Sequence, residues 1–336
     1  MKKLRFGLVG CGKIATCNHA PEMAKLRKGK AEIVALYDIK KGRAEAFAEA
    51  TGLPAAICCK SYRELLAADI DAVIIATPNV FHAPQTLEAL NAGKHVLVEK
   101  PMAGTVAEAD AMINLAARKG LVLQVNQSLR FIPLYVEIQK RVAAGAIGNP
   151  LHVRCLRASA NSPDVGWSPG ATWFVQKRFE GSLVGDIAVH MADFLQGLFG
   201  PVKQIQAITR TRVHEVEDNV VALFDFANGA TGVLELSWTF PKGAGALDIY
   251  GDKAMLCTNS EGFLITYKDA KKKPLQVKNA DLKAIPDSHA TFVKRIASGD
   301  KLAWQAGREA LALCEAIRLA NKAGGAVRPK NRKIRA

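Results

Sequence analysis

The stretch LRFGLVGCGKIA, residues 4–15, runs from an apolar segment directly into two closely spaced glycines. The apolar segment predicts a buried strand, and the glycines predict a tight turn from that strand into a helix. Gly10 permits the turn, Gly12 lets the backbone approach a pyrophosphate, and the small Ala15 allows close packing of the helix on the strand. We therefore expect a dinucleotide-binding turn, with contacts from Gly10, Gly12, Lys13 and Ile14.

Apolar runs alternate with helical patterns over the first 127 residues. The runs expected to form strands are residues 4–10, 32–38, 71–78, 95–101 and 121–126. Nearly continuous apolar strands separated by helices are typical of a parallel sheet that is covered on both faces. The predicted fold class is α/β, with an N-terminal Rossmann domain built on a doubly wound parallel sheet.

The second half of the chain has short strands separated by turn residues, among them Asn228 and Gly229, which predict a hairpin. Within residues 232–240, apolar and polar positions alternate, as in an antiparallel strand with one covered face. The apolar positions are Leu234, Leu236, Trp238 and Phe240. This half predicts an α+β domain with a large, open, mainly antiparallel sheet.

These patterns divide the chain into three segments. Residues 1–125 form the predicted Rossmann domain, residues 126–325 a substrate-binding and oligomerisation domain, and residues 326–336 a basic tail. We expect helices at about residues 287–297 and 306–323, the second of them packing back toward the first domain.

Asp38 closes the second predicted strand, 23 residues after Ala15. At this place a carboxylate accepts hydrogen bonds from the ribose hydroxyls of a bound dinucleotide. It also repels a 2′-phosphate, which favours NAD over NADP as the cofactor. Lys40, Lys41 and Arg43 partly offset that repulsion, so NADP stays the less favoured alternative.

Composition and charge limit the classes of partner. The net charge is +15, but six positive charges lie in the last sixteen residues and the others are scattered, so we expect no nucleic-acid partner. No apolar run has the length of a membrane helix. The seven cysteines contain no C-x-x-C pair, which predicts neither disulfides nor a metal site and fits a reducing, cytoplasmic setting.

Two short stretches carry candidate catalytic groups. HVLVEKPMAG, residues 95–104, ends an apolar strand on Glu99 and Lys100, and strands of a doubly wound sheet deliver their last residues to the ligand crevice. Asp186 and His190 are four positions apart in a predicted helix, so they share one face. An isolated pair of this kind is more often a helix cap or a surface contact.

Three motifs, in this order and spacing, resemble the Gfo/Idh/MocA family of NAD(P)-dependent oxidoreductases over nearly the whole chain. They are VGCGKIA (9–15), ATPNVFHAPQTLEALNAGKHVLVEKP (76–101) and GDIAVHMAD (185–193). The resemblance implies that Lys100 meets Asp186 and His190 in a cleft between the domains. It further implies a set of residues around the dinucleotide, with Glu99 near the nicotinamide ribose: Thr77, Pro78, Asn79, His82, Glu99 and Lys100.

The chain departs from the family pattern at two places. Glu180, Gly181 and Ser182 stand where the family usually has three glycines, and Ala188 replaces a glycine two positions after Asp186. These changes affect the shape of that loop and the pose of the substrate.

The implied reaction is hydride transfer between C4 of the nicotinamide and a hydroxyl-bearing carbon. In this interpretation His190 is the general base, Lys100 stabilises the developing alkoxide, and Asp186 orients the substrate and His190. The substrate class is a sugar, a sugar acid or a polyol. Two other functions stay open: a glycoside-cleaving enzyme that recycles NAD as a catalytic cofactor, and an NAD-binding regulator without turnover.

Substrate contacts are expected from two segments. Asn126, Gln127 and Arg130 follow the fifth strand and carry groups that bind hydroxyls. Trp167 and Trp173 are suited to stack on a sugar ring, or else to fill a core or a subunit interface. The resemblance also implies a homodimer or homotetramer formed through the C-terminal sheet.

Overall fold

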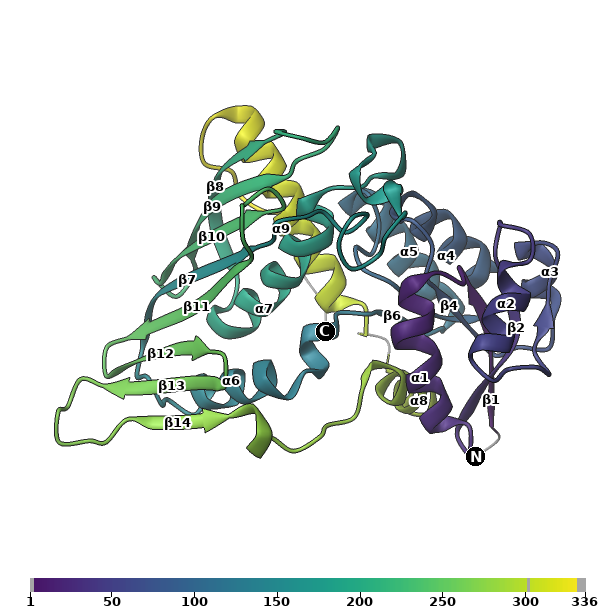
Figure 1. The fold of residues 1–336 in the computed structure, drawn as a ribbon, viewed down its shortest axis with the longest axis horizontal. Coiled ribbons are helices and arrows are strands. Elements are labelled where there is room, and N and C mark those ends of the chain that lie inside the picture. Colours follow the sequence, from purple (N-terminus) through teal and green to yellow (C-terminus); the bar gives the residue numbers. More distant parts are fainter. Residues whose placement is uncertain (1–2, 301–302, 331–336) are drawn as a thin grey trace. The chain divides into compact units, whose positions relative to one another are not determined.

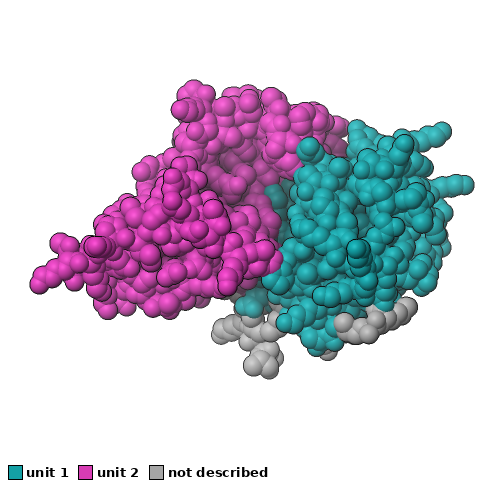
Figure 2. All heavy atoms as spheres, turned by 60° about the horizontal axis from the view of Figure 1, so that its bottom comes forward, with its two compact units in different colours: residues 1–127, 286–308 teal, residues 128–285, 309–336 magenta. Residues whose placement is uncertain are grey.

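The computed structural model describes residues 3–300 and 303–330. The chain divides into two compact units, which Figure 2 colours separately. Unit 1 holds residues 1–127 and 286–308, and unit 2 holds residues 128–285 and 309–336. The predicted boundary after residue 125 therefore lies two residues from the end of the first segment of unit 1.

Unit 1 is built on a six-stranded, wholly parallel sheet with the strand order β3-β2-β1-β4-β5-β6 (Figure 1). The strands are β1 (Leu4–Val9), β2 (Ala31–Tyr37), β3 (Ile57–Cys58), β4 (Ala72–Ile75), β5 (His95–Val98) and β6 (Leu123–Val125). This order confirms the doubly wound fold, and it puts the carboxyl ends of β1 and β4 on either side of the point where the order reverses. Five strands were predicted; β3 was missed because it has two residues and pairs only with β2.

Helices cover this sheet, and local sequence accounts for where they begin and end. They are α1 (Ala20–Leu26), α2 (Arg43–Ala50), α3 (Tyr62–Ala67), α4 (His82–Asn91), α5 (Val106–Lys119) and α8 (Ser288–Ser298). A π-helical turn, Ala15–His19, leads from the glycine turn into α1. α5 begins at a capping box made by Thr105 and Glu108 and ends at Gly120, whose φ of +68° is left-handed.

Residues 286–308 pack with unit 1, although we predicted them in the second domain. α8 buries Phe292 in the core of unit 1, where its ring meets Phe6 edge to face at 6.0 Å. Arg308 then donates hydrogen bonds of 3.1 and 3.2 Å to Asp110 of α5. Because these partners are far apart along the chain, local periodicity alone did not reveal that residues 286–308 pack with unit 1.

Unit 2 contains an eight-stranded sheet with the order β14-β13-β12-β11-β7-β10-β9-β8 (Figure 1). Neighbouring strands are antiparallel except β7 and β10, which run parallel. The strands are β7 (Pro150–Ala158), β8 (Val202–Arg210), β9 (Asn219–Phe226), β10 (Thr231–Ser237), β11 (Ala244–Gly251), β12 (Ala254–Asn259), β13 (Gly262–Tyr267) and β14 (Leu275–Lys278). The expected large, mainly antiparallel sheet is therefore confirmed.

One face of this sheet is covered by α6 (Pro133–Ala143), α7 (Val189–Phe199) and the main part of α9 (Gln305–Ala323) (Figure 1). The predicted hairpin joins β9 to β10, with Gly229 at φ +89°. Leu234, Leu236 and Trp238 are buried as predicted. The prediction for Phe240 was wrong: it lies beyond the end of β10 and is 38% exposed.

The predicted basic tail is only partly described. Val327 pairs with Ile205 of β8 through two backbone hydrogen bonds of 2.8 Å, so this part of the segment is attached to the sheet. Residues 331–336 lie outside the described residues.

Asp218 organises the loop between β8 and β9. It is fully buried, and its carboxylate accepts hydrogen bonds from the amides of Arg212, Val213 and His214 at 2.7 to 3.2 Å. Asn219 Nδ2 donates to it as well, at 2.9 Å. Burial raises the pKa of Asp218, but these donors outweigh burial and lower it. Ionised Asp218 therefore stabilises the loop.

We expect Asp218→Asn to lower the free energy of unfolding by about 2–3 kcal/mol, because an amide group would face buried N–H donors. Since the pKa is lowered, the contribution in the parent is complete above about pH 4 and is lost as the pH falls through the folded-state value. Urea unfolding at neutral and acidic pH measures both effects. Asp225→Asn, at a partly exposed pair with Lys203, is the control and should cost less than about 1 kcal/mol. Equal losses for the two variants would contradict this account.

Candidate active site

The turn after β1 contains two glycines with different reasons to be glycine. Gly10 has a φ of +89°, and a Cβ there would lie 2.4 Å from the carbonyl oxygen of Ala76. A Cβ on Gly12 would meet no atom within 4 Å, so that side of the turn is open. Gly10 is therefore required by the packing of the protein itself, whereas Gly12 leaves clear the backbone that a pyrophosphate would approach. Lys13 is exposed and Ile14 is half-buried.

Asp38 closes this turn from the end of β2. Its Oδ2 accepts a hydrogen bond from the Cys11 amide at 2.9 Å, and its Oδ1 accepts one from the Lys40 amide at 2.8 Å. Arg43 Nη1 lies 3.9 Å from Oδ2. A carboxylate has further lone pairs after two such bonds, so Asp38 can hold the turn and still accept from a ribose. Its contact with Cys11 could not be read from the spacing.

The segment after β4 holds the predicted residues Thr77, Pro78 and Asn79. His82 was expected to line the dinucleotide with them, but its ring is 1% exposed and both nitrogens contact carbonyl oxygens. Nε2 lies 2.8 Å from the Thr77 oxygen and Nδ1 lies 2.7 Å from the Pro101 oxygen. Burial lowers the pKa of His82. In this structure His82 ties the β4 segment to the β5 segment, and its contact with a dinucleotide stays a prediction.

The end of β5 places Glu99 and Lys100 at the same edge of the sheet. Glu99 Oε1 accepts a hydrogen bond of 2.6 Å from Asn126 Nδ2 and lies 3.1 Å from His19 Nε2. Burial raises the pKa of Glu99, but His19, Asn126 and Lys100 outweigh burial and lower it to about 2. The Lys100–Pro101 peptide bond is cis. A half-buried cation therefore stands beside a buried, ionised carboxylate.

The predicted substrate residues after β6 have different partners. Asn126 is 3% exposed and is held by Glu99, and Arg130 is held in unit 2 by two hydrogen bonds of 2.8 Å to Asp193. Gln127 is 1% exposed, and neither of its amide atoms has a hydrogen-bond partner among the residues that the structure describes. Because a buried amide without partners is costly, Gln127 is the residue of this segment best suited to bind a ligand.

In unit 2, Asp186 and His190 lie on consecutive helical segments. Asp186 belongs to the π-helical turn Val184–Ala188, and His190 is in the first turn of α7. The sequence predicted one continuous α-helix here, so the π-helical turn is a difference. Such turns are frequent at functional sites. Asp186 is 4% exposed, and its amide donates to the Ser182 carbonyl at 2.9 Å.

Three residues that the sequence reasoning did not assign brace the start of this helix. Arg318 of α9 donates to Ser182 Oγ at 2.6 Å and to Glu217 Oε1 at 2.9 Å. The Ser182 hydroxyl also accepts a hydrogen bond from the Gly185 amide at 2.9 Å. The serine at the family's third glycine position is therefore a point of attachment between the loop and α9.

The loop before this helix carries the two predicted tryptophans. Trp173 stacks on Phe174 with ring centroids 3.7 Å apart, and Trp167 meets the same ring edge to face at 5.5 Å while staying 45% exposed. Glu180 adopts a φ of +57°, which only glycine usually tolerates. A Cβ on Gly181 would lie 2.2 Å from the Trp173 oxygen. The Trp173 carbonyl thus packs against Gly181, next to the left-handed backbone of Glu180.

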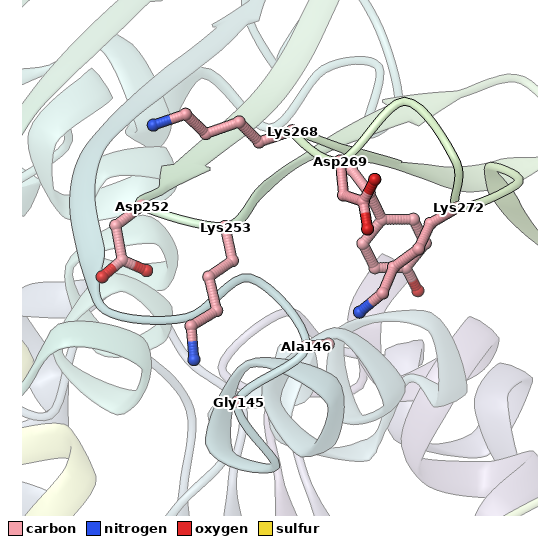
Figure 3. Close-up of a pocket in the computed structure, with 8 residues that line it drawn as sticks. Gly145, Ala146, Asp252, Lys253, Lys268, Asp269 and Lys272 are labelled. Atoms are coloured by element: carbon pink, nitrogen blue, oxygen red, sulfur yellow. The ribbon is translucent and has the colours of Figure 1, made fainter.

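A pocket of about 560 Å³ also lies in unit 2, and no predicted site residue lines it. It is lined by Gly145, Ala146, Asp252, Lys253, Tyr267, Lys268, Asp269 and Lys272. Figure 3 shows that its lysines point in different directions and do not converge on one place. We therefore assign it no chemistry.

Two classes of feature are missing from the described part of the chain. Across residues 3–300 and 303–330, no group of His, Cys, Asp and Glu side chains has an arrangement suited to a metal ion. Within the same ranges, every helix is too short or too polar to cross a membrane.

Comparison with known proteins covers both units. Residues 4–127 match a family model described as an oxidoreductase family with an NAD-binding Rossmann fold. Residues 135–257 match the model of the GFO/IDH/MocA C-terminal domain.

Relatives and solved structures agree with these models. The chain is 30% identical to 1,5-anhydro-D-fructose reductase of Ensifer adhaerens over 75% of this chain and 74% of that protein. It is 30% identical to D-glucoside 3-dehydrogenase of Escherichia coli over 70% of each. Among solved structures, the WlbA dehydrogenase from Bordetella pertussis in complex with NADH and UDP-GlcNAcA is 26% identical, with a TM-score of 0.85 over 99% of both chains.

Alanine substitutions at the two glycines of the first turn should affect stability by different amounts. Gly10→Ala should lower the free energy of unfolding by about 2 kcal/mol or more, because the methyl group would overlap a backbone carbonyl at a left-handed φ. Gly12→Ala should change it by less than about 1 kcal/mol, because its methyl group enters open space. Urea unfolding of both variants measures the difference. A Gly12→Ala loss as large as that of Gly10→Ala would show that the open side does not exist.

Proposed function

Because the chain belongs to the GFO/IDH/MocA family of oxidoreductases, we propose that it transfers a hydride between C4 of NAD and a hydroxyl-bearing carbon of a sugar, sugar acid or polyol. The observation that carries the proposal is the edge of the unit 1 sheet. There Lys100 follows the buried Glu99, at the same edge as the open glycine turn. Doubly wound sheets bind dinucleotides at this edge.

The residues present fit a nicotinamide dinucleotide. The open side of Gly12 leaves room for the pyrophosphate, and Asp38 provides acceptors for the adenosine ribose. When bound, the nicotinamide accepts or returns the hydride. The Asp38 carboxylate supports NAD as the preferred cofactor, since a 2′-phosphate would add negative charge beside it, although Arg43 lies near the same carboxylate.

Three side chains have roles in the proposed reaction. In the oxidation direction, His190 takes the hydroxyl proton while the same carbon loses a hydride, so that a C–OH group becomes a carbonyl. Lys100 donates a hydrogen bond to the developing alkoxide oxygen, and Asp186 orients the substrate and His190. The proposal requires Lys100 of unit 1 and His190 of unit 2 to act on one substrate carbon.

Substrate recognition is proposed for the unsatisfied amide of Gln127 and for the loop that carries Trp167 and Trp173. The amide donates to and accepts from hydroxyls, and an exposed indole stacks on the apolar face of a sugar ring. The names of the relatives, a reductase and a dehydrogenase of sugar derivatives, support this substrate class. They do not favour the glycoside-cleaving alternative.

The test is NADH absorbance during incubation of the purified protein with a panel of sugars, inositols, uronic acids and glycosides, with NAD and separately with NADP. We expect a signal with NAD and one class of polyol or sugar. Bound dinucleotide without turnover on any of them would favour the regulator, and aglycone release without net NADH would favour the recycling glycosidase.

On the substrate so found, His190→Asn and Lys100→Met should each lower kcat by about a hundredfold or more, because a general base or an oxyanion donor is lost. His152→Asn, on the sheet of unit 2 and bonded to Thr231, is the control and should stay within about threefold of the parent. Steady-state kinetics measure all three. Parent-like turnover of His190→Asn would remove it from the mechanism.

We also propose that the face of the unit 2 sheet opposite its helices joins two or four copies of the chain. Ile208 of β8 lies directly across from Val221 of β9, and both are exposed, together with Leu223 on the same face. Adjacent exposed apolar residues on a sheet are typical of an interface.

Leu223→Lys should therefore shift the mass measured by light scattering toward the monomer, because a charge would enter a buried apolar contact. Ile39→Lys, at an exposed apolar residue of unit 1, should leave the mass unchanged. A parent protein that is monomeric at micromolar concentration would contradict the proposal.

A further inference from the structure

Unit 1 contains a continuous chain of four titratable side chains. Glu99 Oε1 lies 3.1 Å from His19 Nε2, His19 Nδ1 lies 2.8 Å from His289 Nε2, and His289 Nδ1 lies 3.4 Å from Asp287 Oδ1. The central contact is a hydrogen bond, and the two end contacts are at ion-pair distance. The reaction proposed above uses neither histidine.

Three distant parts of the chain contribute to this arrangement. Glu99 ends β5, His19 ends the π-helical turn that follows the glycine turn, and Asp287 and His289 begin α8. Both imidazole rings are at most 1% exposed, and Glu99 is 8% exposed. Asp287 is the outer end, with its side chain 24% exposed. This row of four side chains therefore runs from the surface of unit 1 to the carboxylate beside Lys100.

The two rings need three N–H protons to serve all three contacts. The bond between the rings needs one N–H, and each outer nitrogen faces a carboxylate, which favours an N–H there as well. Two rings that carry three N–H protons hold one positive charge between them. If that proton leaves for water, two neutral rings keep only two N–H groups, and one bare nitrogen must then face a carboxylate. Loss of the proton therefore opens one end of the chain.

We propose that His19 and His289 are positioning residues that hold one shared proton between Glu99 and Asp287, and that loss of this proton favours oxidised over reduced nicotinamide. The inference rests on the proposed function, because it takes NAD and NADH as the ligands. With the proton present, the imidazolium charge offsets the Glu99 carboxylate. Without it, the uncompensated carboxylate attracts the cationic oxidised ring and leaves the neutral reduced ring nearly unaffected.

The charges around the chain agree with this direction. Burial lowers the pKa of His289; Asp287 opposes burial, and the neighbouring His19 ring acts in the same sense as burial. The other charged or titratable neighbours are Lys100 and His82 on the Glu99 side, and Glu22 and Lys25 of α1 on the Asp287 side. The Lys100 ammonium partly offsets the negative charge of Glu99 whether the shared proton is present or lost.

The experiment measures the dissociation constants of NADH, by fluorescence, and of NAD, by competition, between about pH 6 and about pH 8.5. In the parent, the ratio Kd(NAD)/Kd(NADH) should fall by about threefold or more as the pH rises. The double variant His19→Asn with His289→Asn, which leaves no imidazole between Glu99 and Asp287, should keep the ratio nearly constant across this range. His152→Asn, outside the chain of contacts, should keep the profile of the parent.

The Asp287→Asn variant distinguishes the effect of this carboxylate on the shared proton from its structural role as the N-cap of α8. Asparagine is as good a helix N-cap as aspartate, so α8 should keep its first turn. Without the carboxylate, however, the shared proton is held less tightly, and the midpoint of the ratio should move to lower pH. A midpoint unchanged from that of the parent would contradict the proposal.

Other outcomes also overturn the proposal. If NADH binds but the ratio in the parent does not change with pH, or if the double variant keeps the parent profile, the shared proton has no effect on the cofactor. If NADH does not bind at any pH, the proposed function fails, and this inference fails with it. Should the double variant not fold, NMR of the ¹⁵N-labelled histidines of the parent decides: two rings that titrate independently would show that no proton is shared.

Discussion

The buried carboxylate of Glu99 is the interaction around which unit 1 is arranged. A buried charge is stable only when it is paired and hydrogen-bonded, and this one takes its partners from Asn126, directly after β6, and from His19 in the π-helical turn after the glycine turn. Those partners fix the end of β5, and with it the position of Lys100. Glu99 and its partners therefore hold this edge of the sheet in place, and the Glu99 carboxylate also puts a negative charge there.

Much of the architecture could be predicted, because apolar periodicity reports which faces of an element are covered. The parallel sheet of unit 1, the antiparallel sheet of unit 2 and the hairpin at Gly229 all follow from such local patterns. The features that were not predicted lack such a local pattern. β3 is too short to show a period, and residues 286–308 pack with unit 1 through contacts such as Phe292 on Phe6, which depend on chain segments far apart in sequence.

For the candidate site, the sequence indicated which residue types stand at the strand ends but not what they contact. His82 is buried between two carbonyl oxygens, and Arg130 is held by Asp193, 63 positions away. Such pairings depend on which side chains the fold brings together, and one sequence carries no signal for them. The glycine-like backbone at Glu180 was hidden for a related reason, since its residue type conceals its φ. The spacing of Asp186 and His190 was visible, whereas the bracing by Arg318 was not.

The division of unit 1 into two segments has a consequence for synthesis on the ribosome. The N-terminal segment is translated before α8 and α9, so its core lacks Phe292, and Asp110 lacks Arg308, until those later residues have been made. In unit 2, the parallel pairing of β10 with β7 likewise has to wait until the intervening α7, β8 and β9 have been made. Until these segments have been made, the nascent chain exposes apolar core surface of both units, which makes chaperones that shield apolar surface relevant to its biogenesis.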